Sequence, residues 1–396
     1  MNQQAKLAFP TLRFPEFKTP WALKHLKDVA TFHDSKRKPL SETERANKKG
    51  IYPYYGASSI IDYVDDYIFD GEYVLLGEDG ANILNRSTPL AFVINGKNWV
   101  NNHAHVIKAN GSNHFLAETL ERIRYEKYNT GTVQPKLNIE ACKNIVFYYT
   151  ESEVEQKKIA SFLSTIDTKI TQIQEKLNLL KQYRIGVTQQ IFHQKIRFKN
   201  ESGSYFPSWE LKPLKNLASK VNVKNISEKE TIVLTNSARD GIVYQNEYFD
   251  KDIANQNNLS GYYVVEKDCF VYNPRISELA PVGPIKRNQL GKGVMSPLYT
   301  IFQFNQDVNV DFMELYFNSS CWFKYMKSVA NFGARHDRMN ITTKDFFELP
   351  CPQPCQDEQK KITDFLQEVD KKITLVENQL KQVKSFKKGL LQQMFV

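Results

Sequence analysis

Apolar residues recur at steps of four and three along two long stretches of the chain. In the first stretch they are Ile159, Leu163, Ile166, Ile170, Ile173, Leu177, Leu180, Val187 and Ile191, with Arg184 in the one slot that breaks the series. In the second they are Ile362, Leu366, Val369, Ile373, Val376, Leu380, Val383, Leu390 and Met394, with Lys387 in the equivalent slot. A spacing that averages 3.5 residues is typical of a coiled coil. The pattern predicts two helices of about 38 residues, each roughly 57 Å long.

The two stretches are copies of each other. Residues 155–170 read EQKKIASFLSTIDTKI and residues 358–373 read EQKKITDFLQEVDKKI, and 155–192 shares 17 of 38 residues with 358–395 without a gap. Because each helix alone would expose its apolar seam, we expect the two helices to pack on each other, and the course of the chain makes them antiparallel. A long helix on the surface of a single globule, or a seam for another subunit, also fits this pattern.

The repetition continues upstream of both helices. The segment WALKHLKDVA at 21–30 matches WELKPLKNLA at 209–218, and GTVQPKLNI at 131–139 matches GARHDRMNI at 333–341. Between these matches, residues 31–129 and 219–331 look unrelated. A repeated frame around two private interiors indicates that the interiors perform different specific tasks.

The repeats predict an α+β protein with two mixed α/β domains in a pseudo-twofold arrangement, separated by two long antiparallel coiled-coil helices. We expect the domains at 1–150 and 205–352, and the helices within 151–193 and 353–396. Ser152 and Glu155 have the spacing of a capping box at the start of the first helix. Pro350, Pro352 and Pro354 prevent a helix from running into the second.

Each interior is predicted to contain strands followed by a helix. In the first, 72–76 and 90–94 have the composition of strands, and Asn95-Gly96 suits a hairpin turn leading to a strand at 99–107. Residues 115–128 have a helical pattern. In the second, we expect strands at 262–272 and 298–304 and a helix at 312–329. A glycine loop at Gly131 or Gly333 then leads to the long helix.

The charge balance favours acidic partners. The formal net charge is +9 and the pI is near 9.0, which points first to nucleic acid and second to a membrane surface. No run of about eighteen apolar residues predicts a membrane span, and the N-terminus lacks an apolar signal core. The five scattered cysteines suit a reducing cytoplasm, where we expect the protein to lie. Cys351 and Cys355 lack a second ligand pair, so we expect no zinc site.

Basic, amide and hydroxyl side chains gather in the predicted loops. Such side chains hydrogen-bond base edges in the major groove, and lysines and hydroxyls hold phosphates. The candidate DNA-binding residues of the first half are Arg37, Lys38, Lys48, Lys49, Tyr55, Ser58, Asn101, Asn102, His103, Thr132, Gln134 and Lys136. Those of the second half are Asn236, Ser237, Arg239, Asn273, Arg275, Lys286, Arg287, Arg335 and Arg338. For any single residue, a solvated surface charge is the simpler interpretation.

The sequence contains none of the catalytic motifs expected of an enzyme that modifies or cleaves DNA. There is no [NDS]PP[YFW] loop of a DNA methyltransferase, and Gly291-Lys292-Gly293 is not a phosphate-binding P-loop. Glu155-Gln156-Lys157 and its copy at 358–360 match the E-x-K of some nucleases, but both begin predicted helices. His103 and His105 could share a strand face, without an acidic set nearby to complete a metal site. The pattern is typical of a binding protein with no catalytic or metal site.

These segments together resemble the DNA-specificity subunit of type I restriction–modification systems. The resemblance is carried by W-x-L-K-x-L-K-D-V-A at 21–30, YPYYGASSIIDYVDDYIFDGEYVLLGEDGAN at 52–82, VNNHAHVI at 100–107, QPKLNI at 134–139 and the repeated EQKKI stretch. It implies two target-recognition domains that each read a short half-site of a bipartite double-stranded DNA target. The two helices would hold these domains apart.

The resemblance also implies partners. Two methyltransferase (modification) subunits and restriction subunits would dock on this chain and bind S-adenosylmethionine, ATP and Mg²⁺, while this chain would bind no cofactor and carry no catalysis. Two other classes remain open on the residues alone. One is a coiled-coil scaffold that binds RNA or protein through its basic loops, and the other is an enzyme with an unfamiliar active site.

Overall fold

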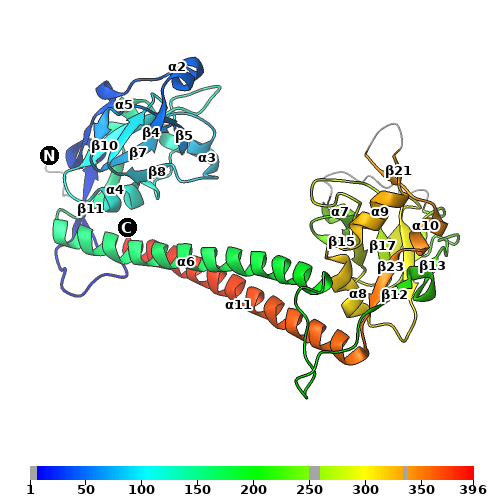
Figure 1. Ribbon diagram of the computed structural model, residues 1–396. Coiled ribbons are helices and arrows are strands. Elements are labelled where there is room, and N and C mark those ends of the chain that lie inside the picture. The colour runs from blue at the N-terminus through cyan, green and yellow to red at the C-terminus, as the bar shows by residue number, and fades with distance from the viewer. Residues whose placement is uncertain (1–6, 249–258, 333–336) are drawn as a thin grey trace. The chain divides into compact units, whose positions relative to one another are not determined.

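The computed structural model describes residues 7–248, 259–332 and 337–396. The chain divides into two compact units, Met1–Gln174 with Asn378–Val396, and Glu175–Glu377 (Figure 1). Each unit therefore contains one of the two unrelated interiors, 31–129 or 219–331, together with a part of both long helices. Within the described residues, no helix is both long enough and apolar enough to cross a lipid bilayer.

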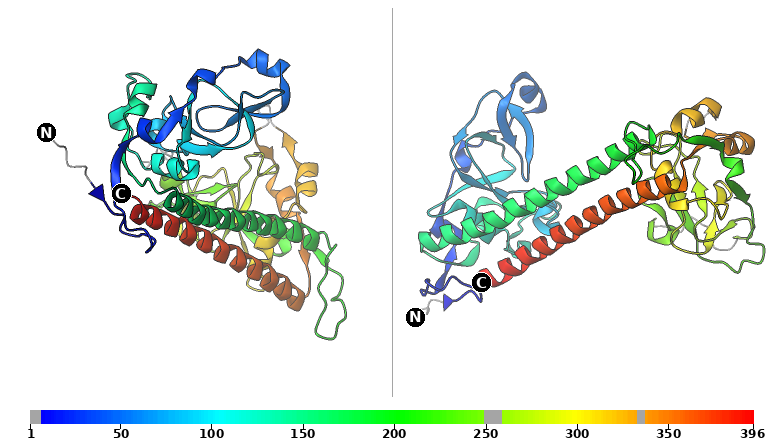
Figure 2. Two further views of the ribbon diagram at one scale, coloured as in Figure 1. Left: turned by 90° about the vertical axis from the view of Figure 1, so that its left-hand side faces the viewer. Right: turned by 60° about the horizontal axis from the view of Figure 1, so that its bottom comes forward.

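The two long helices predicted from the heptads are present. They are α6 (Glu153–Phe192) and α11 (Gln356–Met394), and they lie side by side in antiparallel directions within each unit (Figure 1 and Figure 2). In the first unit, Ile159 and Leu163 of α6 share a core with Leu390 and Met394 of α11. In the second unit, the end of α6 instead meets the start of α11, where Ile191 joins the core that contains Ile362.

The two polar slots in the heptad series form ion pairs between the helices. Arg184 Nε lies 2.9 Å from Asp370 Oδ1, and Lys387 Nζ lies 2.7 Å from Asp167 Oδ1. Because Asp167 and Asp370 are copies of one repeated residue, the two pairs are the same contact made once in each unit. A polar pair inside an apolar seam favours one register over others, because any shift would leave the charges unpaired.

The first unit contains two four-stranded sheets and one three-stranded sheet. One four-stranded sheet has the order β3 (Ala30–Phe32), β10 (Ala104–Ala109), β7 (Tyr73–Gly77), β8 (Ala91–Ile94). The second has the order β5 (Ile60–Val64), β4 (Lys49–Tyr55), β9 (Lys97–Val100), β6 (Phe69–Asp70), and the third joins β1 (Leu7–Ala8), β2 (Trp21–His25) and β11 (Val146–Tyr149). The helices are α1 (Leu26–Val29), η1 (Asp34–Lys36), α2 (Glu42–Asn47), α3 (Asn82–Asn85), α4 (Asn113–Leu120), η2 (Glu126–Tyr128) and α5 (Ile139–Lys143).

The second unit repeats one four-stranded sheet of the first, and it also repeats the antiparallel pairing of the W-x-L-K strand with the strand before the long helix. Its four-stranded sheet has the order β13 (Ala218–Val221), β20 (Thr300–Phe304), β17 (Phe270–Tyr272), β18 (Ile285–Arg287). Its two-stranded sheets are β12 (Glu210–Pro213) with β23 (Pro350–Gln353), β14 (Leu234–Ser237) with β15 (Gly241–Tyr244), β16 (Tyr263–Val265) with β19 (Gly293–Met295), and β21 (Asn331–Phe332) with β22 (Met339–Asn340). The helices are η3 (Leu214–Asn216), α7 (Gln245–Tyr248), α8 (Val310–Phe317), α9 (Phe323–Val329) and α10 (Thr343–Phe347).

A common frame therefore extends into interiors that look unrelated in sequence. In both units the strand after the W-x-L-K segment pairs with the last strand before a short helix, and two further strands follow in the same order. That helix is α4 in one unit and α8 in the other, with Phe115 and Phe312 at equivalent buried positions. Among the described residues, the sheet β5-β4-β9-β6 has no four-stranded counterpart in the second unit.

The predicted hairpin at Asn95-Gly96 is wrong. The turn connects β8 to β9, but β8 pairs with β7, whereas β9 pairs with β4 and β6 in the other sheet. The strand predicted at 99–107 is likewise divided, because Asn101 Oδ1 accepts a hydrogen bond from the His103 amide and forms a turn between β9 and β10. The chain thus crosses from one sheet to the other at both ends of β9.

Three further predicted elements are also divided. The strand predicted at 262–272 becomes β16 and β17, in different sheets, around Asp268 with φ of 68°. The helix predicted at 115–128 ends at Leu120, and only η2 follows. The helix predicted at 312–329 becomes α8 and α9, because Ser319 Oγ donates to the Tyr316 carbonyl and replaces a helical backbone bond.

A buried Arg–Glu–Trp cluster joins each domain to the first turn of a long helix. Glu155 is 1% exposed, and its carboxylate accepts from Arg13 Nε at 2.7 Å and from Trp21 Nε1 at 3.3 Å. In the second unit, Glu358 is 0% exposed and accepts from Arg197 Nη2 and Trp209 Nε1, both at 2.9 Å. The glutamates of the repeated EQKK are therefore structural ion-pair residues.

The residues next to these arginines repeat as well. Phe14 packs edge-on against Phe162 of α6, and Phe198 packs against the equivalent Phe365 of α11, with ring centroids 5.9 and 5.5 Å apart. The capping box predicted at Ser152 forms in one direction only. Ser152 Oγ accepts from the Glu155 amide, but the Glu155 carboxylate is used by the cluster.

We expect Glu155→Gln to lower the free energy of unfolding by about 3–5 kcal/mol, because it leaves the buried Arg13 guanidinium without its counter-charge. Urea denaturation measures this loss. Glu153→Gln is the matched control in the same helical turn. Glu153 is exposed and, within the described residues, pairs only with Lys157, so this substitution should lower the free energy of unfolding by less than about 0.5 kcal/mol. Equal effects of the two substitutions would contradict a structural role for the cluster.

Candidate nucleic-acid interface

Four loops of the first unit lie side by side at one end of its sheets. They are residues 34–38, 78–80, 101–103 and 132–136, which we call loop cluster 1. Backbone hydrogen bonds join them: Leu137 donates to Glu78, Gly80 donates to Pro135, and Asn101 donates to Tyr55 at the end of β4. The folding of the chain thus brings together candidates that are a hundred residues apart.

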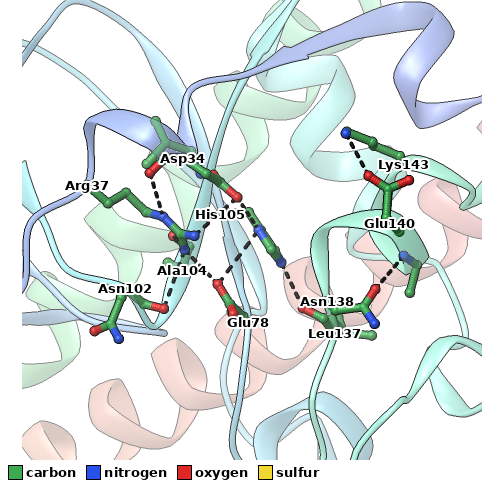
Figure 3. Close-up of polar contacts among 12 residues, drawn as sticks. Asp34, Arg37, Glu78, Asn102, Ala104, His105, Leu137, Asn138, Glu140 and Lys143 are labelled. Carbon is green, nitrogen blue, oxygen red and sulfur yellow. Dashed lines mark hydrogen bonds and ion pairs between the residues drawn. The ribbon is translucent and has the colours of Figure 1, made fainter.

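His105 of β10 is at the centre of the contacts beneath these loops (Figure 3). The ring is 1% exposed, with Nδ1 2.6 Å from Asp34 Oδ2 and Nε2 2.8 Å from the Leu137 carbonyl. Burial by itself favours the neutral ring, but the hydrogen bond to Asp34, with a further contribution from Cys142, outweighs it and raises the pKa of His105 to about 10. Both nitrogens face oxygen acceptors, so the ring is a doubly donating imidazolium.

Arg37 completes this network. Its Nη1 lies 2.6 Å from Glu78 Oε2 and 2.8 Å from the Ala104 carbonyl, and its Nη2 lies 3.3 Å from Asp34 (Figure 3). The side chain is only 14% exposed. Two buried cations and two carboxylates therefore hold the loops together, and Arg37 has little donor capacity left for a phosphate.

The same carboxylates do not form a metal site. Single ligand atoms of Asp34, Glu78 and His105 lie within 4.8 Å of one another, but both imidazole nitrogens are hydrogen-bonded and Arg37 neutralises the acids. Acidic residues do lie beside both histidines, unlike the expectation from sequence. His103 pairs with Asp79 at 2.7 Å, so each imidazole has its own carboxylate partner.

The outer surface of loop cluster 1 presents the remaining candidates to solvent. The exposed ones are Lys38, Asn102, His103, Thr132, Gln134 and Lys136. Asn101 is buried and shapes its loop, while Tyr55 and Ser58 are half-buried at the adjoining turn, where burial raises the pKa of Tyr55. Lys48 and Lys49 lie apart, in ion pairs with Asp65 and Asp62 across the β4–β5 hairpin.

The second unit has a different set of loops, residues 237–240, 273–276 and 337–338, which we call loop cluster 2. Asn236 and Asn273 are buried beneath it, and Asn273 Nδ2 donates to the Asn236 carbonyl at 3.0 Å. The Ile276 amide donates to the Asp337 carbonyl, which joins two of the loops. A cavity of about 420 Å³ lies here, lined by Asn236, Ser237, Asn273 and Arg275.

Three arginines of loop cluster 2 are exposed: Arg239, Arg275 and Arg338. Among the described residues, the side chains of Arg239 and Arg275 have no ion-pair partner, whereas Arg338 Nε lies 3.7 Å from Asp337 Oδ2. Ser237 Oγ instead accepts from the amides of Arg239 and Asp240 and fixes the turn. Arg335, and with it Gly333, lies outside the described residues.

Lys286 and Arg287 are not part of loop cluster 2. They lie on β18 against α8, where Lys286 Nζ donates to Asn318 at 2.9 Å. Arg287 pairs with Asp268, Asp311 and Glu314, and its side chain is 14% exposed. Like Arg37, it is committed to carboxylates of its own domain.

A family model described as the type I restriction modification DNA specificity domain matches residues 18–182 and 297–385, more than half of the chain. The chain belongs to this specificity family. A putative type I restriction enzyme specificity subunit of Haemophilus influenzae, S.HindORF215P, is 34% identical over 160 residues, which is 40% of this chain. The match spans 37% of the length of that relative.

Solved structures share the fold of this specificity-family chain. A type I restriction–modification S subunit from M. genitalium matches with a TM-score of 0.54 and 15% identity, over 98% of this chain and 99% of that one. A chain from a study of complex assembly and conformational transition of the type I R-M system matches with a TM-score of 0.52 and 14% identity, over 96% and 97%. Because the sequence identities are 15% and 14%, these matches show a shared fold.

The network beneath loop cluster 1 predicts a pH dependence. His105 has a pKa above that of the unfolded chain, so its contribution to stability is complete below about pH 6.5 and is lost as the pH rises through about 10. NMR titration should find His105 protonated at pH 8. His33 is the internal control, because burial and the nearby Lys36 and Lys108 lower its pKa. A neutral His105 ring at pH 8 would contradict the network.

Proposed function

We propose that this chain is the DNA-recognition subunit of a type I restriction–modification complex. Loop cluster 1 would read one half-site of a bipartite double-stranded target, and loop cluster 2 would read the other. Arg, Asn, Gln and His side chains hydrogen-bond base edges, while lysines bind phosphates without regard to sequence. Membership of the specificity family supports this proposal.

The main support for this proposal is that the two units share the same frame but have dissimilar loop clusters. Both units share the four-stranded sheet order, the Arg–Glu–Trp cluster and the interhelical ion pair. The two loop clusters differ in their residues and in the sheets that support them. A binder of one repeated ligand would keep the loops alike, whereas two unlike half-sites require unlike loops.

The chemistry of such a complex would belong to its partners. We propose that two methyltransferase subunits bind S-adenosylmethionine, that restriction subunits bind ATP and Mg²⁺, and that this chain scaffolds both without catalysis of its own. Three residues that match catalytic or metal-binding patterns in the sequence make contacts that support a structural role. Glu155 and Glu358 are in buried ion pairs, and His105 donates both ring protons to oxygen acceptors.

Replacing residues 31–129 by the corresponding interior of another family member should change one half-site of the methylated sequence and leave the other unchanged. Each loop cluster is built within its own unit, so exchanging one leaves the other intact. Long-read methylome sequencing of cells carrying the exchanged chain, the original chain or neither measures this. Exchange of residues 219–331 is the matched control and should alter the opposite half-site.

Three outcomes would contradict the proposal. They are a methylome that does not depend on the chain, a change in both half-sites after a single exchange, and methylation or cleavage of DNA by the purified chain alone. The last outcome would favour an enzyme.

A further inference from the structure

A hollow in the first unit is lined by four basic residues, and the contacts described above account only for Lys387. It lies between the end of α4 and the last turns of α11 and has a volume of about 370 Å³. Its basic residues are Arg122, Lys384, Lys387 and Lys388, beside Ile170 and Leu391. All of these residues belong to the first unit, and we call the hollow the cationic groove.

The positive charge of the groove is not cancelled by its acids. Lys387 alone is neutralised, by Asp167 and Glu118. Glu121 also lines the groove, but Oε1 accepts from the amides of Leu90 and Ala91 and Oε2 pairs with Arg86. Glu121 is therefore engaged outside the groove, and Asp167 and Glu118 are engaged by Lys387.

Arg122, Lys384 and Lys388 have no ion-pair partner within the described part of the chain. The Arg122 guanidinium is half-buried, 5.3 Å above the Phe395 ring, and burial lowers its pKa. Lys384 and Lys388 are exposed and lie one helical turn apart on α11. A partly buried guanidinium without an acceptor is costly unless an anion from outside supplies one.

The second unit supplies an internal comparison, because the same frame occurs there without these charges. The residue equivalent to Lys388 is Ile185, and the one after the α8 cap, equivalent to Arg122, is Ser319. Lys181, equivalent to Lys384, is neutralised by Glu377 at 2.6 Å, whereas the position equivalent to Glu377 is the uncharged Gln174. The cationic groove is thus a property of the first unit, and the repeated frame does not require it.

We propose that the cationic groove binds a backbone phosphate segment of the DNA, through Arg122, Lys384 and Lys388. The inference rests on the proposed function and adds to it a contact outside loop cluster 1. Lysine is depleted at the cores of protein–protein interfaces, whereas lysine and arginine supply most phosphate contacts to DNA. Such a contact strengthens binding and carries no sequence information.

The test compares the assembled complex of this chain and its methyltransferase subunits with one carrying Arg122→Gln, Lys384→Gln and Lys388→Gln. Each binds a duplex that contains the methylated sequence mapped in cells, at a series of salt concentrations. Loss of three phosphate contacts should flatten the slope of log K against log salt by about 2.7, at about 0.9 per contact. The methylated sequence should stay the same.

The control variant carries Lys181→Gln, Lys324→Gln and Lys371→Gln, which removes the same charge from exposed positions of the second unit. Its salt slope should match that of the original chain. An unchanged slope for the groove variant would overturn the proposal. Loss of assembly with the methyltransferase subunits would also overturn it, because it would indicate that the groove contacts protein. If the unaltered complex fails to bind the mapped duplex, the proposed function itself is wrong.

Discussion

A buried carboxylate in the first turn of each long helix fixes one domain to that helix. It pairs with an arginine and a tryptophan from the N-terminal end of the domain, while the helix itself follows the domain. Both ends of each domain are thereby fixed to the same helical turn. A buried charge is stable only when paired and hydrogen-bonded, so this arrangement tolerates little movement of the domain on its helix. Gln156 strengthens this attachment in the first unit, because its side chain accepts a hydrogen bond from the Ser112 amide and donates one to the Thr150 carbonyl.

The repeated frame supports the loops, and the loops provide the surfaces that differ between the two units. The frame consists of the sheet order β3-β10-β7-β8 or β13-β20-β17-β18, the buried glutamate and the interhelical ion pair. The loops are held by networks that differ in kind. An imidazolium and an arginine between two carboxylates lie under loop cluster 1, and two buried asparagines lie under loop cluster 2. Two chemically different loop clusters on a repeated frame are what the proposed reading of two different half-sites requires.

The elements that could be predicted from the sequence are those whose residues follow a regular local pattern. The heptads gave both long helices, and the polar slots at Arg184 and Lys387 were visible as interruptions of the series. Pairings between distant residues were not predictable. Arg37 and Arg287 have the appearance of free cations in the sequence, and only folding brings Glu78 and Asp311 to them. Arg13 and Arg197 were missed because they precede Trp21 and Trp209 by different distances, although each lies in a repeated Arg-Phe pair.

We propose that the length of the paired helices α6 and α11 sets the length of the spacer between the two half-sites. The most direct measurement adds one heptad to α6 and one to α11, between the Asp167–Lys387 and Arg184–Asp370 pairs, and maps the methylated sequence by long-read sequencing. Seven residues add roughly 10.5 Å of helix, about three base pairs at 3.4 Å each. The account predicts a spacer about three base pairs longer with both half-sites unchanged. Methylation of the original sequence with its original spacer would contradict it.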